Sequence, residues 1–351
     1  MWIPPRTTGC TGSCSISHSS TPSGGDLERR EGRNLRKALW SLALAIAVYT
    51  GMVLYSDASA VGEAVTRLNP AWLPVILGLP LLNYLLRFLK WQYFLARVDV
   101  RVPWKRSLEV FVSGFSMTVS PGKFGELLKC YLLRREEGIE VSRTSPVVVA
   151  ERITDLISMV VIALIGAAFL GGRAGLLAAA AGTVFVGAVM VALLSQRAFG
   201  CLTDLLCRFS FFRGRREAIC RFQDHCTNLL DARSLAVTVP LGILSWGAEA
   251  LVLCAVARSL GYTIGAGLAL LAHAAGTIAG AVSMIPGGLG LTEITIDGLL
   301  TDTLPVSTAT AVTLLMRFAT LWFAVILGVA ALGLQRRRDR GPTAPRRSPR
   351  D

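Results

Sequence analysis

Long apolar stretches with few polar interruptions dominate the pattern along this chain. A membrane-spanning helix needs about 20 mostly apolar residues, and six stretches reach roughly that length. The pattern therefore predicts an all-α polytopic membrane protein. The six predicted spans are Lys37–Tyr55, Pro70–Phe88, Pro146–Leu170, Gly175–Leu194, Ala236–Ala257 and Thr308–Leu332.

Lys and Arg are unevenly distributed between the spans. They are dense before the first span, between Lys90 and Arg143, and between Arg197 and Arg233, but there is none between Ser259 and Met316. Cytoplasmic loops of membrane proteins carry an excess of these residues. We therefore expect a multi-pass protein of the cell (inner) membrane with both termini in the cytoplasm.

Two more apolar stretches do not fit as simple spans. Leu108–Leu128 and Ile264–Leu300 are too apolar for free loops, yet the charge pattern makes each begin and end on one side of the membrane. Each also contains Gly and Pro. Irregular backbone is tolerated at membrane depth only where protein or a cavity surrounds it. We expect two re-entrant or broken segments.

The two broken segments resemble each other. An offset of 165 residues aligns Pro121 with Pro286, and it also aligns Arg152 with Arg317 inside predicted spans. Chance similarity of Gly-rich stretches is the alternative, and the arginine match argues against it. Each unit holds three spans, an odd number, so the second copy should be inverted. Paired Gly/Pro interruptions in inverted halves are typical of a transporter's substrate site.

Composition supports a membrane protein and limits the possible partners. The chain is 52% hydrophobic and 17% charged, with a net charge of +13. In such a protein the excess charge indicates anionic membrane lipids as partners and not nucleic acid. The spacing of the cysteines is not a zinc pattern, and we expect neither a metal nor a cofactor. Only three His are present and no Asp-x-Asp pair occurs, so the sequence predicts no enzyme.

The chain divides into five predicted regions. The ends are a disordered tail and a basic tail, and a cytoplasmic segment with alternating apolar and basic residues predicts amphipathic helices on anionic lipid. In order, the regions are a tail at 1–34, the first repeat with the start of the second at 35–195, the amphipathic segment at 196–233, the remainder of the second repeat at 234–335, and the tail at 336–351.

The broken segments and the buried arginines are the candidate site. A Pro-Gly break before a helix leaves backbone N–H groups and a positive dipole end that attract phosphate or carboxylate. Arg152 has Glu151 and Asp155 beside it, so it serves either a buried ion network or an anion site. Arg317 has no acid within helical reach and needs a partner from elsewhere.

Acidic residues and a histidine add candidates for charge movement. Glu126 and Glu293 begin the helices after the breaks, where they either complement the helix dipole or act as proton-coupling or gating carboxylates. Glu249 and His273 are further candidates. By contrast, Arg87 and Lys90 end the second predicted span, where snorkelling to the interface is the simplest interpretation, with Trp91, Tyr93 and Trp104 as an aromatic belt.

The predicted substrate-binding residues come from both repeats, and no residue is assigned a catalytic role. They are Pro121, Gly122, Gly125, Glu126, Glu151, Arg152, Asp155, Pro286, Gly287, Gly288, Gly290, Glu293 and Arg317.

Several of these motifs together resemble one known family. The chain is similar to the family named for the transmembrane region of lysylphosphatidylglycerol synthase, which comprises flippase-like integral membrane proteins. The resemblance covers roughly Leu35 to Arg336. It rests on Arg87 with Trp91, on the stretch Ser120–Glu126, on Glu151, Arg152 and Asp155, and on Pro286–Gly290 with Glu293.

The resemblance implies movement of a lipid, or of a lipid-linked sugar or amino-acid headgroup, between leaflets. Some relatives carry a soluble aminoacyl-transfer domain. Only a short tail follows Arg336, so we do not expect this chain alone to synthesise a lysyl-lipid. Two alternatives to a flippase remain: a membrane-embedded transferase acting on a polyprenyl or phospholipid phosphate, and a scaffold for a lipid-modifying enzyme.

Overall fold

The computed structural model describes residues 58–120, 126–170 and 226–340, with a few single positions between 50 and 188. Within these ranges every regular element is a helix. Four helices are long and apolar enough to cross a membrane, namely Pro70–Arg97, Val141–Leu170, Ala232–Ser259 and Val306–Gln335. The chain is therefore an all-α polytopic protein, as predicted.

The four long helices confirm the second, third, fifth and sixth predicted spans. They are α3 (Leu73–Arg97), α6 (Val141–Leu170), α10 (Ala232–Ser259), and the consecutive helices α13 (Val306–Arg317) and α14 (Phe323–Arg340), which a short π-helix, η5 (Phe318–Trp322), connects. Apart from a few single positions, the first and fourth predicted spans lie outside the described residues, as do the N-terminal tail, most of the amphipathic segment and residues 121–125. The predicted C-terminal tail at 336–351 is described in part, because α14 continues through its first residues to Arg340.

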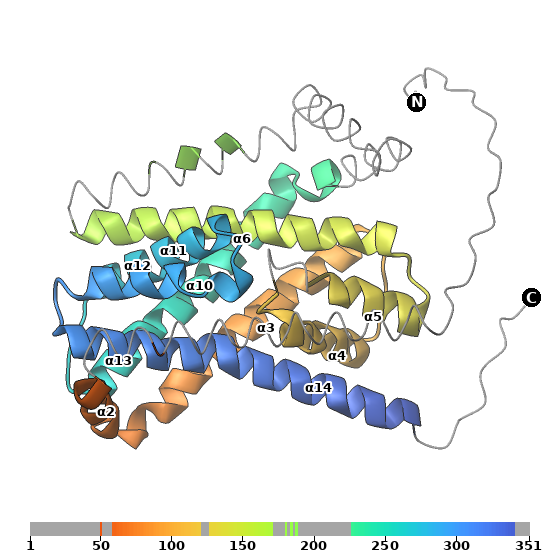
Figure 1. The fold of residues 1–351 in the computed structure, drawn as a ribbon. Coiled ribbons are helices and arrows are strands. Elements are labelled where there is room, and N and C mark those ends of the chain that lie inside the picture. The colour runs from red at the N-terminus through yellow and green to blue at the C-terminus, as the bar shows by residue number, and fades with distance from the viewer. Residues whose placement is uncertain are drawn as a thin grey trace, which may run out of the picture.

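Each broken segment forms two helices with an irregular turn between them. The first hairpin is α4 (Trp104–Gly114), the short helix η2 (Phe115–Met117) and α5 (Leu128–Glu137). The second hairpin is α11 (Ala266–Val282), the short helix η4 (Pro286–Gly288) and α12 (Leu291–Leu300). In Figure 1 the first hairpin lies at one end of the long helices and the second at the other, with their turns facing the middle.

The offset of 165 residues extends to whole elements. Adding 165 to Val141, where α6 begins, gives 306, and α13 begins at Val306. Shifted by 165, the span Val141–Leu170 becomes 306–335, and these are the bounds of the last long helix, Val306–Gln335. Shifted likewise, α4 becomes 269–279, which lies within α11. Figure 1 shows α6 and the α13–α14 pair running in opposite directions.

The two halves interlock, because α6 and α14 each pack on the hairpin of the other half. Helix α6 packs on α11, while α14 packs on α4 and η2. Glycines allow both approaches. A Cβ at Gly166 of α6 would lie 2.6 Å from the backbone N of Leu271, and a Cβ at Gly328 of α14 would lie 2.2 Å from the backbone N of Ser116. Small residues at helix contacts permit this closeness in membrane proteins.

Helices α3 and α10 cross between the two hairpins. Asn83 donates from Nδ2 to the carbonyl of Ser245 at 3.0 Å, and Ser245 donates from Oγ to the carbonyl of Asn83 at 3.3 Å. Both residues are almost fully buried. These two hydrogen bonds join the halves at the point where they cross.

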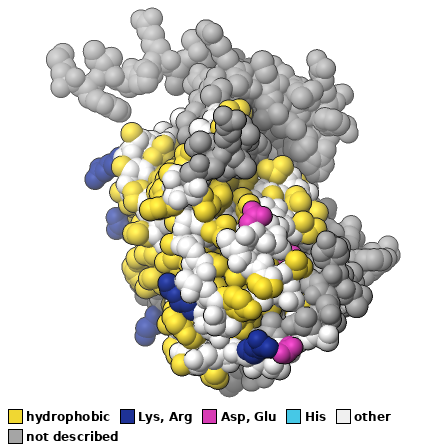
Figure 2. Space-filling view, turned by 90° about the vertical axis from the view of Figure 1, so that its left-hand side faces the viewer, with side chains coloured by type: hydrophobic (Ala, Val, Ile, Leu, Met, Phe, Trp, Pro, Cys, Tyr) yellow, Lys and Arg dark blue, Asp and Glu magenta, His cyan; other side chains and the backbone are white. Residues whose placement is uncertain are grey.

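One helix was not expected from the sequence. Helix α2 (Ala58–Thr66) lies between the first and second predicted spans, and it packs on α13. Its Val61 joins the apolar core formed mainly by α10, α11 and α13. Figure 2 views the molecule from this end, where the described surface is mainly hydrophobic and uncharged, with few Lys or Arg. The absence of Lys and Arg between Ser259 and Met316 agrees with this surface.

Candidate functional site

Buried charged residues gather where the two hairpin turns meet. The turns are in contact, because a Cβ added at Gly287 of the second hairpin would lie 3.4 Å from Cγ1 of Val119 of the first. Burying charges is costly unless they are paired, and most of them are. The buried or half-buried charged residues here are Arg87, Lys90, Glu126, Lys129, Glu151, Arg152, Asp155, Glu249, Glu293 and Arg317.

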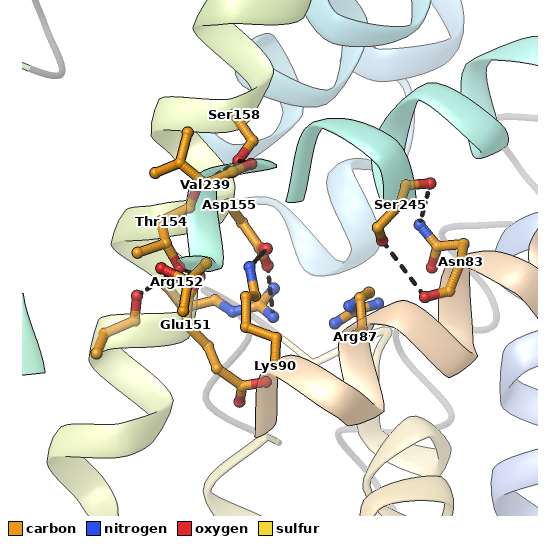
Figure 3. Close-up of polar contacts among 12 residues, drawn as sticks. Asn83, Arg87, Lys90, Glu151, Arg152, Thr154, Asp155, Ser158, Val239 and Ser245 are labelled. Carbon is orange, nitrogen blue, oxygen red and sulfur yellow. Dashed lines mark hydrogen bonds and ion pairs between the residues drawn. The ribbon is translucent and has the colours of Figure 1, made fainter. Parts of the chain in front are cut away.

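The first half holds a network of ion pairs around Asp155. Lys90 of α3 pairs with Oδ1 of Asp155, and Arg152 reaches Oδ2 of the same carboxylate at 2.8 Å. The Nε atom of Arg152 also lies 3.1 Å from Oε2 of Glu126, next to the first turn. Figure 3 shows Lys90 and Arg152 converging on Asp155. This network joins the second span, the third span and the first hairpin.

Glu151 belongs to a separate pair. Its Oε2 accepts a hydrogen bond from Lys129 Nζ of α5 at 2.7 Å, and the Glu151 side chain is fully buried. The ammonium of Lys129 also lies over the Trp91 ring, 4.4 Å from its centroid. Cation–π contacts of this kind stabilise a desolvated cation. The structure thus pairs Glu151 with Lys129 of the first hairpin.

The second half has a simpler arrangement around Arg317. Arg317 donates from Nε to Oε1 of Glu293 at 2.6 Å and from Nη2 to the carbonyl of Gly287 at 2.8 Å. Glu293 accepts a second hydrogen bond, from the backbone N–H of Gly290 at 2.7 Å, through Oε2. Arg317 therefore finds its partner outside its own helix, as expected, and it fastens both sides of the second turn.

Three backbone N–H groups of the second turn already have acceptors within the protein. Gly288 donates to the carbonyl of Ile285, Leu289 donates to the carbonyl of Pro286, and Gly290 donates to Glu293. Gly287, Gly288 and Gly290 all have positive φ angles, which glycine adopts readily. The Glu293 carboxylate therefore already occupies the N-terminus of α12. The equivalent Pro121, Gly122 and Gly125 lie outside the described residues.

Arg87, Lys90 and Trp91 correct the sequence-based interpretation. We expected them at the membrane interface, but α3 continues to Arg97, and all three are at least 91% buried inside the bundle. Trp91 donates from Nε1 to Ser107 Oγ at 3.2 Å. In the sequence, a Lys or Arg at the end of an apolar stretch looks the same in two cases. Its side chain can extend to the membrane interface, or it can form an ion pair inside the bundle. The one available signal was that Arg87 and Lys90 lie three residues apart, on one helix face.

Arg87 differs from the other buried cations. Its guanidinium carbon lies 5.7 Å from the Phe115 ring centroid and 5.1 Å from that of Trp246. Its nearest ion-pair contact, Nη2 to Oε1 of Glu126, is long at 3.8 Å. Its Nε is buried and has no hydrogen-bond partner among the described residues. Figure 3 shows Arg87 between the Asp155 network and the Asn83–Ser245 crossing.

Arg87 faces a small cavity at the meeting point of the two turns, which we call the central cavity. Its volume is about 80 Å³, and its charged or titratable lining residues are Tyr84, Arg87, Glu249, His273 and Arg317. Both hairpins contribute to its wall, through Phe115 of the first and Gly288 of the second. Among the predicted candidates, Gly287, Gly288 and Arg317 line it.

An apolar pocket lies beside the central cavity, and we call it the side pocket. Its volume is about 250 Å³, and Leu156, Met159, Trp246 and Ile278 contribute much of its apolar wall. The Arg152–Asp155 pair lies at its edge. The two spaces share wall residues, which are Trp246, Thr277, Gly280, Ala281 and Gly288. The central cavity, with its charged residues, and the apolar side pocket thus share part of one wall.

Comparison with known proteins relates the chain to one family. None of the curated proteins compared with the chain matches it. The sequence pattern of one family does match, over residues 40–328, a range that includes the first three long helices, most of the fourth, both hairpins and the buried charges. The chain is a multi-pass membrane protein that belongs to the family described as the lysylphosphatidylglycerol synthase TM region.

Proposed function

We propose that this protein is a flippase-like transporter that moves an anionic lipid, or a lipid-linked anionic headgroup, between the two leaflets. The observation that carries the proposal is Arg87. Arg87 lies between two aromatic rings, lines a cavity in the bundle, and has only a long ion-pair contact with Glu126, and such a guanidinium is suited to bind a phosphate. Charged residues inside a membrane mark substrate pathways by default.

The two adjoining spaces match the two parts of a lipid. The central cavity offers Arg87 to a headgroup, and the apolar side pocket offers room for part of a hydrocarbon chain. Ligand sites are commonly apolar with a few well-placed polar groups. A lipid lying with its phosphate near Arg87 and a chain against Met159 and Ile278 would use both spaces.

The arrangement of the halves supports transport across the bilayer. We infer that the halves are inverted copies, because the offset of 165 residues pairs their helices and their hairpins lie at opposite ends. In transporters of this kind the site lies near the midplane, and one half rocks against the other. Lys and Arg are dense around the first hairpin, which we place on the cytoplasmic side of the cell membrane.

Reconstitution tests the proposal directly. The purified protein is placed in vesicles that contain a headgroup-labelled fluorescent anionic phospholipid, and a membrane-impermeant quencher is added outside. We expect the protein to raise the quenched fraction above one half. An unchanged fraction with and without protein, across several anionic lipids, would overturn the proposal.

A variant of Arg87 tests whether this residue takes part in the proposed lipid transport. We expect Arg87→Gln to slow lipid movement about tenfold or more, because a hydrogen bond to a charged group contributes roughly 1.5–3 kcal/mol and about 1.4 kcal/mol corresponds to a factor of ten. Arg101→Gln is the matched control, since Arg101 is exposed and outside the bundle core. Equal rates for the two folded variants would remove Arg87 from the site.

A further inference from the structure

Two titratable side chains of the central cavity have no role in the transport step described so far. His273 lies in the middle of α11 and is only 3% exposed, and its ring centroid is 6.1 Å from that of Trp246. Glu249 of α10 lines the same cavity and is half-buried. Ionisable residues at membrane depth are costly, and they frequently form proton relays.

The surrounding charges explain why a proton would be needed. Helix α3 contributes Arg87 and Tyr84, α10 contributes Glu249, and α13 contributes Arg317, which is already paired with Glu293 of α12. The first hairpin turn contributes Phe115 and Thr118, which carry no charge. Glu249 and Arg87 both lie close enough to the Tyr84 hydroxyl to interact with it electrostatically. An anionic headgroup beside Arg87 would therefore share the cavity with the Glu249 carboxylate.

Adding an anion to this cavity is unfavourable unless another positive charge arrives with it. Like charges a few ångströms apart repel strongly in a medium of low dielectric constant. Protonation of His273 or Glu249 removes the repulsion. Histidine is the side chain that changes charge most readily near neutral pH.

The other buried carboxylates are poorly placed for this role. Asp155 is held by Lys90 and Arg152, Glu151 by Lys129, and Glu293 by Arg317. Glu126 lies 3.1 Å from Arg152. Each of these four carboxylates is thus already engaged with a cation inside the bundle. Glu126 and Glu293, which the sequence suggested as proton-coupling residues, are therefore weaker candidates than His273 and Glu249.

We propose that His273 and Glu249 form a proton-binding site of the central cavity, and that an anionic lipid headgroup crosses the membrane together with a proton. This inference rests on the proposed flippase function. The proton enters from water on the side where the headgroup enters, is held by His273 or Glu249 while the headgroup is bound, and leaves to water on the other side.

Vesicles with a trapped pH-sensitive dye test the proposal on the wild-type chain. They contain an anionic phospholipid with a fluorescent headgroup, and lipid movement and internal pH are followed together. We expect an outside-acid gradient of about one pH unit to accelerate inward lipid movement several-fold, up to about tenfold, because one pH unit is a tenfold ratio of proton concentration. Inward movement should also acidify the interior.

Variants of His273 and Glu249 test whether these two residues bind the transported proton. We expect His273→Gln and Glu249→Gln each to reduce lipid-dependent acidification about tenfold or more, with less dependence of lipid movement on the gradient. The matched controls are His18→Gln, near the N-terminus, and Glu137→Gln, at an exposed position of α5, and both should behave like the wild type.

Each outcome separates the two proposals. Lipid movement in the wild type without acidification, and at the same rate with and without the gradient, overturns proton coupling and leaves the flippase function standing. Acidification that persists in both folded cavity variants overturns the assignment to His273 and Glu249. Absence of any lipid movement in the wild type overturns the flippase function and proton coupling with it.

Discussion

Arg317 and Glu293 form a buried ion pair that fastens the second hairpin to the last span. Their Nε and Oε1 atoms are 2.6 Å apart, and the Glu293 side chain is completely buried. Because Glu293 also accepts the N–H of Gly290, and Arg317 also donates to Gly287, the pair determines the shape of the turn. Two charged side chains that look like substrate ligands in the sequence thus have a structural task.

Removing one member of this pair should destabilise the protein strongly. We expect Arg317→Met alone to lower the free energy of unfolding by about 3–5 kcal/mol, because it leaves a buried carboxylate without its cation. The double variant Arg317→Met with Glu293→Gln should regain much of that loss. The stability of the single and the double variant is measured by thermal unfolding, with size-exclusion chromatography as the readout of folded protein. Additive losses in the double variant would show that the pair is not coupled.

Arg152 should tolerate truncation better than Arg317. Its side chain is 24% exposed, against 11% for Arg317, and its partner Asp155 keeps a second cation, Lys90. We therefore expect Arg152→Ala to leave more folded protein than Arg317→Ala while still impairing lipid movement. The comparison uses the yield of monodisperse protein and the quenching assay. A larger folding defect in Arg152→Ala would contradict the pairing seen here.

The glycines between the halves should not accept even a methyl group. At Gly166 and Gly328 an added Cβ would meet backbone atoms of the opposing hairpin at 2.6 Å and 2.2 Å, which no side-chain rotation relieves. We expect Gly166→Ala and Gly328→Ala each to cost about 1–3 kcal/mol or more by overpacking. Gly247→Ala in α10 is the control, because no atom lies within 4 Å of its added Cβ. Equal melting temperatures for the three variants would refute the close packing.

Cysteine labelling tests the opposed insertion of the hairpins. Asp302 follows α12 and Arg101 precedes α4, and both are exposed. In a background without other cysteines, we expect a membrane-impermeant maleimide to label Asp302→Cys from outside intact cells and Arg101→Cys only after the cells are opened. Labelling of both positions from one side would exclude inverted halves.

Much of the fold could be predicted because membrane insertion requires long apolar stretches, which are visible in any sequence. The offset that aligns Pro121 with Pro286 extended to whole helices, and Arg317 had to find a distant partner. The interior position of Lys90 could not be predicted, since its partner Asp155 lies 65 residues away and only the packing of α3 on α6 brings them together. Arg87 was missed for the same reason.

The interlocking of the halves has a consequence for how the chain is made. Ser116 and Phe115, in the first turn, are synthesised long before Gly328, against which they pack. Chains emerge and fold from the N-terminus, so the first hairpin enters the membrane before its neighbour exists. Until the last span arrives, the first turn must be covered by lipid, by a chaperone or by the insertion machinery. Ribosome-associated chains that stop before residue 328 should be substrates for membrane quality control.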